Sequence, residues 1–272
     1  MILRPEAKPQ NFTDEFVPAW EAVARTQKGK SAKYYLVRQP DHARISGEIA
    51  RHLAIPGAPP VDNDIVRGIS MHDEGWKEFD NGCERLSVTP AMYSGDNVAL
   101  NAEGRPLSFL EIKAGDFLRA WLGSIDCAEA VAPISALIVS GHFCRLGNFG
   151  MGMGVYSGDD LRSVGEFLAA EEQRQERLLR LQSRGKREVK YWTDVLQFCD
   201  LLSLYLCCGS EESVEFPQRI GPGGQTIRLQ LKDGMFVLSP SLFAKEVEFS
   251  LEAHPYPASA EVTYVTLDWI LR

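Results

Sequence analysis

The sequence lacks any run of about 20 uninterrupted apolar residues, which is the length that a membrane-spanning helix requires. No charged and then apolar leader segment precedes residue 30, so this region carries no secretion signal. Internal repeats and low-complexity blocks are also lacking. These absences predict a cytoplasmic protein that does not insert into a membrane.

A basic charge excess is lacking as well, because the formal net charge is -8 at pH 7. Nucleic-acid polymers and anionic membrane surfaces are bound through a positive electrostatic field. The charge therefore argues against both partners and favours a small soluble substrate.

Cysteine is present but occurs in no C-x-x-C pair. Most of the six cysteines lie in apolar segments that are predicted to be helical, where a free thiol behaves as a small hydrophobic group. We expect reduced, structural cysteines: Cys83, Cys127, Cys144, Cys199, Cys207 and Cys208.

Hydrophobic residues make up 44% of the 272 residues, enough to form the core of one large domain or of two modest ones. Apolar periodicity predicts a mainly α-helical fold, because seven segments have a helical pattern. These segments are residues 16–26, 42–53, 65–76, 108–125, 132–143, 159–182 and 187–208, and the last is expected to end near Gly209.

Alternating and β-branched residues predict strands mainly in the C-terminal part of the chain. Residues 226–231, 235–239, 246–252 and 261–271 form an expected antiparallel β meander, with a hairpin turn at Asp233-Gly234. Residues 1–3 and 34–39 are predicted to add short strands earlier in the chain. The predicted domains are a helical domain over 1–212 and a small β subdomain over 213–272 packed on it.

An irregular insertion is predicted over residues 80–106, where glycine, proline and asparagine interrupt the periodicity. Loops of this length are uncommon without a purpose. The insertion directly follows two candidate ligands, so it is expected to be either a lid or specificity loop, or a surface insertion without a role.

Histidine and aspartate occur at positions where the pattern predicts burial. Asp200 lies within the apolar run VLQFCDLLSLYL, and His142 lies at the end of the apolar segment 132–143. An unpaired buried carboxylate costs several kcal/mol, so Asp200 needs a cation or several hydrogen-bond donors. His42 in the first turn of one predicted helix, and His72 and Asp73 towards the end of another, would complete such a site.

Imidazole nitrogens together with carboxylate oxygens are suitable ligands for a divalent metal ion. The candidate ligands are His42, His72, Asp73, His142 and Asp200. Mn, Fe, Co, Ni or Mg suits this mixed set, and Zn is also compatible with it. The wide spacing of the ligands along the chain excludes a local finger-type site.

The pairs Asp41-His42 and His72-Asp73, together with Asp200, resemble the motifs of the HD-domain superfamily of metal-dependent phosphohydrolases. The segments LVRQPDHARISGEIA, SMHDEGW, RPLSFLE and LIVSGHF look like an uncharacterised branch of that superfamily, and the resemblance covers residues 33–208. It implies a phosphodiesterase-like helical core that holds one or two ions per chain between its helices.

The resemblance also implies roles for individual residues. His42, His72, Asp73 and Asp200 match the four ligands of the superfamily, and His142 would serve a second ion or a substrate phosphate. The chain has one histidine between the His72-Asp73 pair and Asp200, where the best-known two-metal members typically have two. The resemblance therefore leaves the number of ions at one or two.

The expected function is metal-dependent hydrolysis of a small phosphorylated compound or nucleotide by a metal-activated water. The residues expected to take part in catalysis are Asp73, His142, Glu74 and Lys77. Glu74 would orient His72 or carry a proton, whereas Lys77, Arg44 and Arg145 would contact phosphate.

Two alternatives remain at this point. Some HD-type proteins resembling inositol oxygenase use a diiron centre to oxidise a small substrate. The chain could also be a non-catalytic metal- or ligand-binding protein that associates, for example as a homodimer, through the edges of its C-terminal strands.

Overall fold

The computed structural model describes residues 1–7, 15–59, 61–77, 79–80, 100–257 and 264–272. The fold is mixed α/β, with 53% of the chain helical and 19% in strands, and it contains an eight-stranded mixed sheet. The prediction of a mainly α-helical fold with a small β meander was therefore wrong. Most of the predicted insertion at 80–106 lies outside the described residues.

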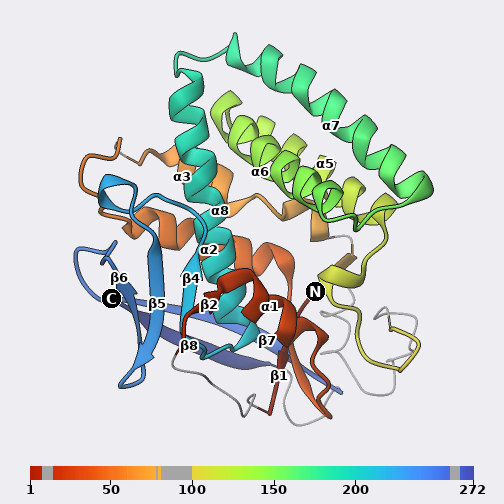
Figure 1. Cartoon of the computed structure of the whole chain (residues 1–272), viewed down its shortest axis with the longest axis vertical. Coiled ribbons are helices and arrows are strands. Elements are labelled where there is room, and N and C mark those ends of the chain that lie inside the picture. Colours follow the sequence, from red (N-terminus) through yellow and green to blue (C-terminus); the bar gives the residue numbers. More distant parts are fainter. Residues whose placement is uncertain (8–14, 60, 78, 81–99, 258–263) are drawn as a thin grey trace.

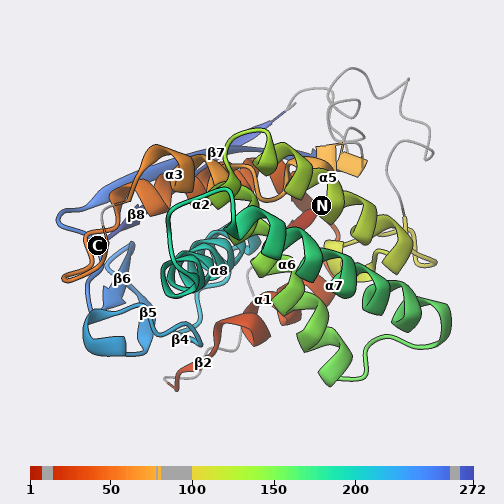
Figure 2. The same ribbon diagram turned by 90° about the horizontal axis from the view of Figure 1, so that it is seen from above.

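A long helix, α8, passes through the middle of the molecule from the helical end to the sheet (Figures 1 and 2). It is almost continuously buried from Trp192 onwards and contacts α1, α2, α3, α6 and β1. The α-helices are α1 (Ala19–Lys28), α2 (Gln39–His52), α3 (Asn63–Ser70), α5 (Ala114–Glu129), α6 (Pro133–Gly152), α7 (Gly158–Leu179) and α8 (Lys186–Cys208). Short 3-10 helices are η1 (Glu74–Trp76), η4 (Phe109–Glu111) and η5 (Pro222–Gly224).

The sheet combines strands from both ends of the chain, in the order β1-β3-β7-β8-β6-β5-β4-β2. The strands are β1 (Ile2–Pro5), β2 (Val17–Pro18), β3 (Tyr34–Val37), β4 (Val214–Phe216), β5 (Ile227–Lys232), β6 (Met235–Ser239), β7 (Val247–Tyr256) and β8 (Val265–Leu271). β3 pairs with β7, while β2 with β4 and β6 with β8 form parallel pairs. The C-terminal strands are thus part of a larger mixed sheet, because N-terminal strands extend it at both edges.

Several local predictions were confirmed. The strand predicted at 34–39 is β3, and Asp233 and Gly234 form the turn between β5 and β6 with positive φ values of 50° and 79°. Helix α8 ends at Cys208 and is capped by Gly209, so it ends near Gly209, as the sequence predicts. In the described part of the chain, the apolar stretches of the helices are too short to cross a membrane.

A single hydrophobic cluster joins the helices to the sheet. It contains side chains from both sides of residue 212, including Ile45 of α2, Leu202 of α8, and Leu229 and Trp269 of the sheet. Because α8 is in contact with helices on several sides, residues projecting from it can meet residues from α2, α3 and α6 in the interior. The predicted domain boundary at residue 212 stays a prediction.

Candidate metal centre

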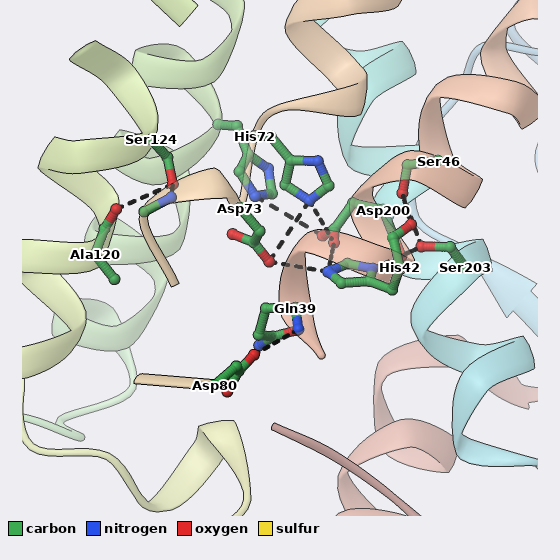
Figure 3. Close-up of polar contacts among 12 residues, drawn as sticks. Gln39, His42, Ser46, His72, Asp73, Asp80, Ala120, Ser124, Asp200 and Ser203 are labelled. Carbon is green, nitrogen blue, oxygen red and sulfur yellow. Dashed lines mark hydrogen bonds and ion pairs between the residues drawn. The ribbon is translucent and has the colours of Figure 1, made fainter. Parts of the chain in front are cut away.

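Four separate segments converge beside the middle of α8 (Figure 3). Helix α2 carries His42, the turn after α3 carries His72 and Asp73, α6 carries His142, and α8 carries Asp200. All five side chains are buried, and they form two overlapping groups that share His72 and could hold a metal ion. The five predicted ligands are thus brought together, although they span 159 positions of the chain.

Nitrogen and oxygen atoms alternate around the centre. His42 Nε2 lies 2.9 Å from Asp73 Oδ2 and 3.9 Å from Asp200 Oδ1. His72 Nε2 lies 3.2 Å from the same oxygen of Asp200 and 3.8 Å from Asp73 Oδ2. Two imidazole nitrogens and two carboxylate oxygens therefore form an alternating ring.

These separations match the geometry of ligands around one ion. Metal–nitrogen and metal–oxygen bonds of about 2.1 Å place two ligands about 3 Å apart at right angles and about 4 Å apart on opposite sides. The four distances between His42, His72, Asp73 and Asp200 run from 2.9 to 3.9 Å. Each of these nitrogen–oxygen separations thus fits two ligands of one divalent ion, and the complete groups that could hold an ion are His42, His72 and Asp73, and His72, His142 and Asp200.

The sequence predicts that His72 and Asp73 lie in a helix, but the structure places both in the turn that follows α3. Helix α3 begins after Asp62, which accepts a hydrogen bond from the Ile65 amide, and it ends at Ser70. The chain then makes a turn, in which Met71 has φ -110° and Asp73 has φ -116°. Adjacent helical residues point about 100° apart, whereas the turn allows both His72 and Asp73 to face the same centre.

Gly75 holds this turn close to α5. Its amide donates a hydrogen bond to Ser124 Oγ at 3.0 Å, and a Cβ at this position would lie only 2.0 Å from the Ala120 carbonyl oxygen. The next residue, Trp76, is buried in the core. The close contact between the backbone of Gly75 and the backbone of α5 therefore fixes where the His72-Asp73 pair lies relative to the other ligands.

The ring of His72 has a defined orientation. Its Nδ1 lies 2.7 Å from the carbonyl oxygen of Ile69, which can only accept a hydrogen bond, so Nδ1 carries the proton. Nε2 then faces Asp200. Burial by itself would lower the pKa of His72, but Asp73 and Asp200 outweigh it and raise the pKa to about 9. A cation, either a proton or a metal ion, is thus favoured at this nitrogen.

Asp200 and His142 complete the electrostatic arrangement. Burial alone would raise the pKa of Asp200, but the hydrogen bond from His72 and the neighbouring histidines lower it to about 2. Burial lowers the pKa of His142 to about 4 despite the opposing charge of Asp200. At neutral pH the centre therefore contains an ionised Asp200 and a neutral His142, whose Nε2 lies 3.8 Å from Asp200 Oδ2.

The expected phosphate-binding and proton-carrying residues lie apart from the ligands. Lys77 is 65% exposed and forms an ion pair with Glu74. Arg44 pairs with Asp41, and Arg145 pairs with Asp194. No contact between Glu74 or Lys77 and the centre is seen among the described residues, so a direct role for either in catalysis stays a prediction.

Two serines that the sequence analysis did not select contact the centre. Ser203 Oγ lies 2.8 Å from His42 Nδ1, and Ser46 Oγ lies 2.8 Å from Ser203 Oγ. The spacing of these serines in the sequence could have identified them. Ser46 follows His42 by four residues and Ser203 follows Asp200 by three, so each serine lies on the same face of its helix as a candidate ligand.

Comparisons with known proteins give one match. Comparison with the curated proteins and comparison with solved structures each gave no match. A family model described as "protein of unknown function (DUF3891)" matches residues 23–255, a range that includes all five candidate ligands. The chain therefore belongs to the DUF3891 family.

Proposed function

We propose that this protein is a metal-dependent hydrolase of a small phosphorylated compound or nucleotide. The observation that carries the proposal is the buried ring formed by His42, His72, Asp73 and Asp200, in which each nitrogen–oxygen separation suits two ligands of one divalent ion. A divalent ion held there would acidify a water molecule and offset the negative charge on phosphoryl oxygens. The ion itself would be Mn, Fe, Co, Ni, Mg or Zn.

The carboxylates of the centre have more contact with solvent than its histidines. The side chains of His42 and His72 are fully buried, whereas those of Asp73 and Asp200 are 9% and 12% exposed. A water molecule held by the ion would therefore lie nearest to the two carboxylates.

His142 is the group best suited to act on the substrate. It is neutral at neutral pH because burial lowers its pKa to about 4, and its Nδ1 has no hydrogen-bond partner in the described part of the chain. A neutral imidazole next to Asp200 can donate a hydrogen bond to a phosphate oxygen or pass on a proton. We therefore assign His142 to substrate binding or proton transfer.

The arrangement favours one ion over two. A second ion would have to use His142 and Asp200 Oδ2, which are 3.8 Å apart, and in the described residues the cluster around them adds only His72. His72 Nε2 already faces the first position. This shortage of ligands weighs against a diiron oxygenase and leaves hydrolysis as the better supported reaction.

Purified protein is expected to cleave at least one member of a panel of phosphate monoesters, diesters and nucleotides when manganese is added. A chelator should stop this turnover, and excess manganese should restore it. Replacing His72 with alanine should lower the activity at least about a hundredfold, since it removes an ion ligand.

The matched control is His52→Ala, because His52 lies on α2 but packs against Phe249, away from the centre. This variant should retain activity. If the whole panel stayed intact while manganese was bound, the hydrolase proposal would be wrong. A large loss of thermal stability on chelation, again without turnover, would identify a structural ion.

Metal affinity is expected to rise with pH. The pKa of His72 in the metal-free protein is raised to about 9, so the ring is protonated at neutral pH and an ion must displace this proton. Affinity should therefore increase about tenfold per pH unit between about pH 7 and pH 9 and level off above that range. Competition titrations against a metal-binding dye at several pH values would measure this slope.

The raised pKa of His72 also makes the stability of the metal-free protein depend on pH, but this stability falls as the pH rises. A raised histidine pKa stabilises the folded protein at pH values below 6.5, the pKa of the unfolded chain, and this stabilisation is lost as the pH rises through about 9.

A metal affinity that did not change between pH 7 and pH 9 would contradict the metal-binding prediction, because it would show that no proton is displaced from His72.

A further inference from the structure

Two buried serines lie directly behind His42, on the side away from the proposed ion (Figure 3). Ser203 Oγ of α8 lies 2.8 Å from His42 Nδ1 and 2.9 Å from the Asp200 carbonyl oxygen. Ser46 of α2 lies 2.8 Å from Ser203 Oγ and donates to the His42 carbonyl oxygen at 3.1 Å. Both serines are fully buried, so no bulk water competes for these contacts.

The two proposed histidine ligands have different kinds of partner. His72 Nδ1 faces the carbonyl oxygen of Ile69, which accepts hydrogen bonds and never donates one. His42 Nδ1 faces the hydroxyl of Ser203, which can do either. The proton at His72 Nδ1 is therefore fixed by its acceptor, whereas a single proton on the His42 ring can be on either nitrogen.

Two arrangements of the same number of protons are available to His42, and the second leaves Nε2 without a proton to donate. In the first, Nε2 carries the proton and donates it to Asp73 Oδ2 at 2.9 Å, while Ser203 donates to Nδ1. In the second, Nδ1 carries the proton and donates to Ser203 Oγ, while Ser203 donates to the Asp200 carbonyl oxygen. The N–H bond at Nε2 is lost, one at Nδ1 is formed, and the ring stays neutral.

A metal ion can bind only the second arrangement, because it needs the lone pair of Nε2. We propose that Ser203 is a positioning residue that reverses the direction of its hydrogen bond to His42 when an ion binds. This inference rests on the proposed function only in so far as the centre holds an ion. The hydroxyl group of Ser203 on α8 would thus select the tautomer of His42 that binds the metal ion.

Ser203→Ala should remove this selection and lower the affinity for zinc about ten- to a hundredfold, as is typical for the loss of a hydrogen bond to a metal-bound histidine. Zinc is a suitable probe because it is diamagnetic and permits nitrogen NMR of the histidine rings. The chain has five histidines, so single substitutions would assign their signals.

In the unsubstituted protein, the His42 signals should change from the Nε2–H form to the Nδ1–H form on addition of zinc. In Ser203→Ala, the zinc-bound His42 signals should show a weaker hydrogen bond at Nδ1. Ser135→Ala is the matched control, because Ser135 is equally buried and donates to the Asp64 carbonyl oxygen, away from the centre. It should bind zinc like the unsubstituted protein.

Equal zinc affinity and equal His42 signals in Ser203→Ala and the unsubstituted protein would overturn the inference. A Nδ1–H form both before and after zinc would also overturn it, because no reversal would then take place. Failure of the hydrolase proposal would look different: zinc would bind with the expected tautomer change, but no phosphoester would be cleaved. An unsubstituted protein that binds no zinc would overturn the inference, and one that also binds no manganese would overturn the hydrolase proposal as well.

Discussion

Replacing Asp200 with asparagine is expected to lower metal affinity more than about a hundredfold and metal-dependent hydrolysis about a thousandfold. Asp200 Oδ1 lies 3.2 Å from His72 Nε2 and 3.9 Å from His42 Nε2, so it closes the ring of ligands on the α8 side. A thousandfold loss corresponds to about 4 kcal/mol of transition-state stabilisation, which is within the contribution expected of a catalytic ion. Calorimetric titration with manganese and initial-rate assays would measure the two effects.

Asp194→Asn provides the control for this substitution. Asp194 is also an α8 carboxylate, but it forms ion pairs with Arg145 and Lys190 away from the ligands. The control removes the same charge and should leave manganese affinity unchanged within about twofold, since a partly exposed ion pair has little effect at a distance. Normal metal binding by Asp200→Asn would contradict the assignment of Asp200 as a ligand.

The second large effect is expected at Gly75. An added Cβ would lie 2.0 Å from the Ala120 carbonyl oxygen and 2.7 Å from the Ser124 amide nitrogen, and both atoms belong to the backbone of α5. Because neither can move freely, Gly75→Ala should reduce the free energy of unfolding by about 2–4 kcal/mol. Metal affinity should fall with it, since the turn that carries His72 and Asp73 must shift.

Denaturant unfolding of Gly75→Ala beside Gly165→Ala would test this expectation. Gly165 lies inside α7 with open space around the position of its Cβ, so alanine there should stabilise the protein by up to about 1 kcal/mol. If Gly75→Ala were as stable as the unsubstituted protein, the close contact between the turn and α5 would not be a constraint on the centre.

The ligands could be predicted from the sequence because each is unusual in its local context. Asp200 lies among apolar residues of a helix, and a buried carboxylate requires a partner. His142 is likewise in an apolar helical segment, and His72 is followed directly by a second ionisable residue. The cost of burying such groups is a local property, so the sequence alone indicates it.

The position of the His72-Asp73 pair relative to α3 could not be predicted in the same way. Ile65, Ile69 and Trp76 are all buried at spacings of four and seven residues, which is typical of one continuous helix. The chain nevertheless leaves the helix after Ser70, and Gly75 then packs against α5, which begins about 40 residues later. The helix end depends on that long-range contact.

The sheet was underestimated for a related reason. β1 has four residues and β2 has two, so neither provides enough residues for a clear alternating pattern. β2 pairs in parallel with β4, almost 200 residues away, and β3 pairs with β7. Strand pairing over such distances depends on tertiary packing, which no local pattern reveals.

Anomalous diffraction from a manganese-soaked crystal is the most direct test of the central claim that two imidazoles and two carboxylates hold one ion. The account predicts a single strong peak per chain, about 2.1 Å from His42 Nε2, His72 Nε2, Asp73 and Asp200. An ion bound through other residues, or fully loaded protein without a peak among these four side chains, would contradict it.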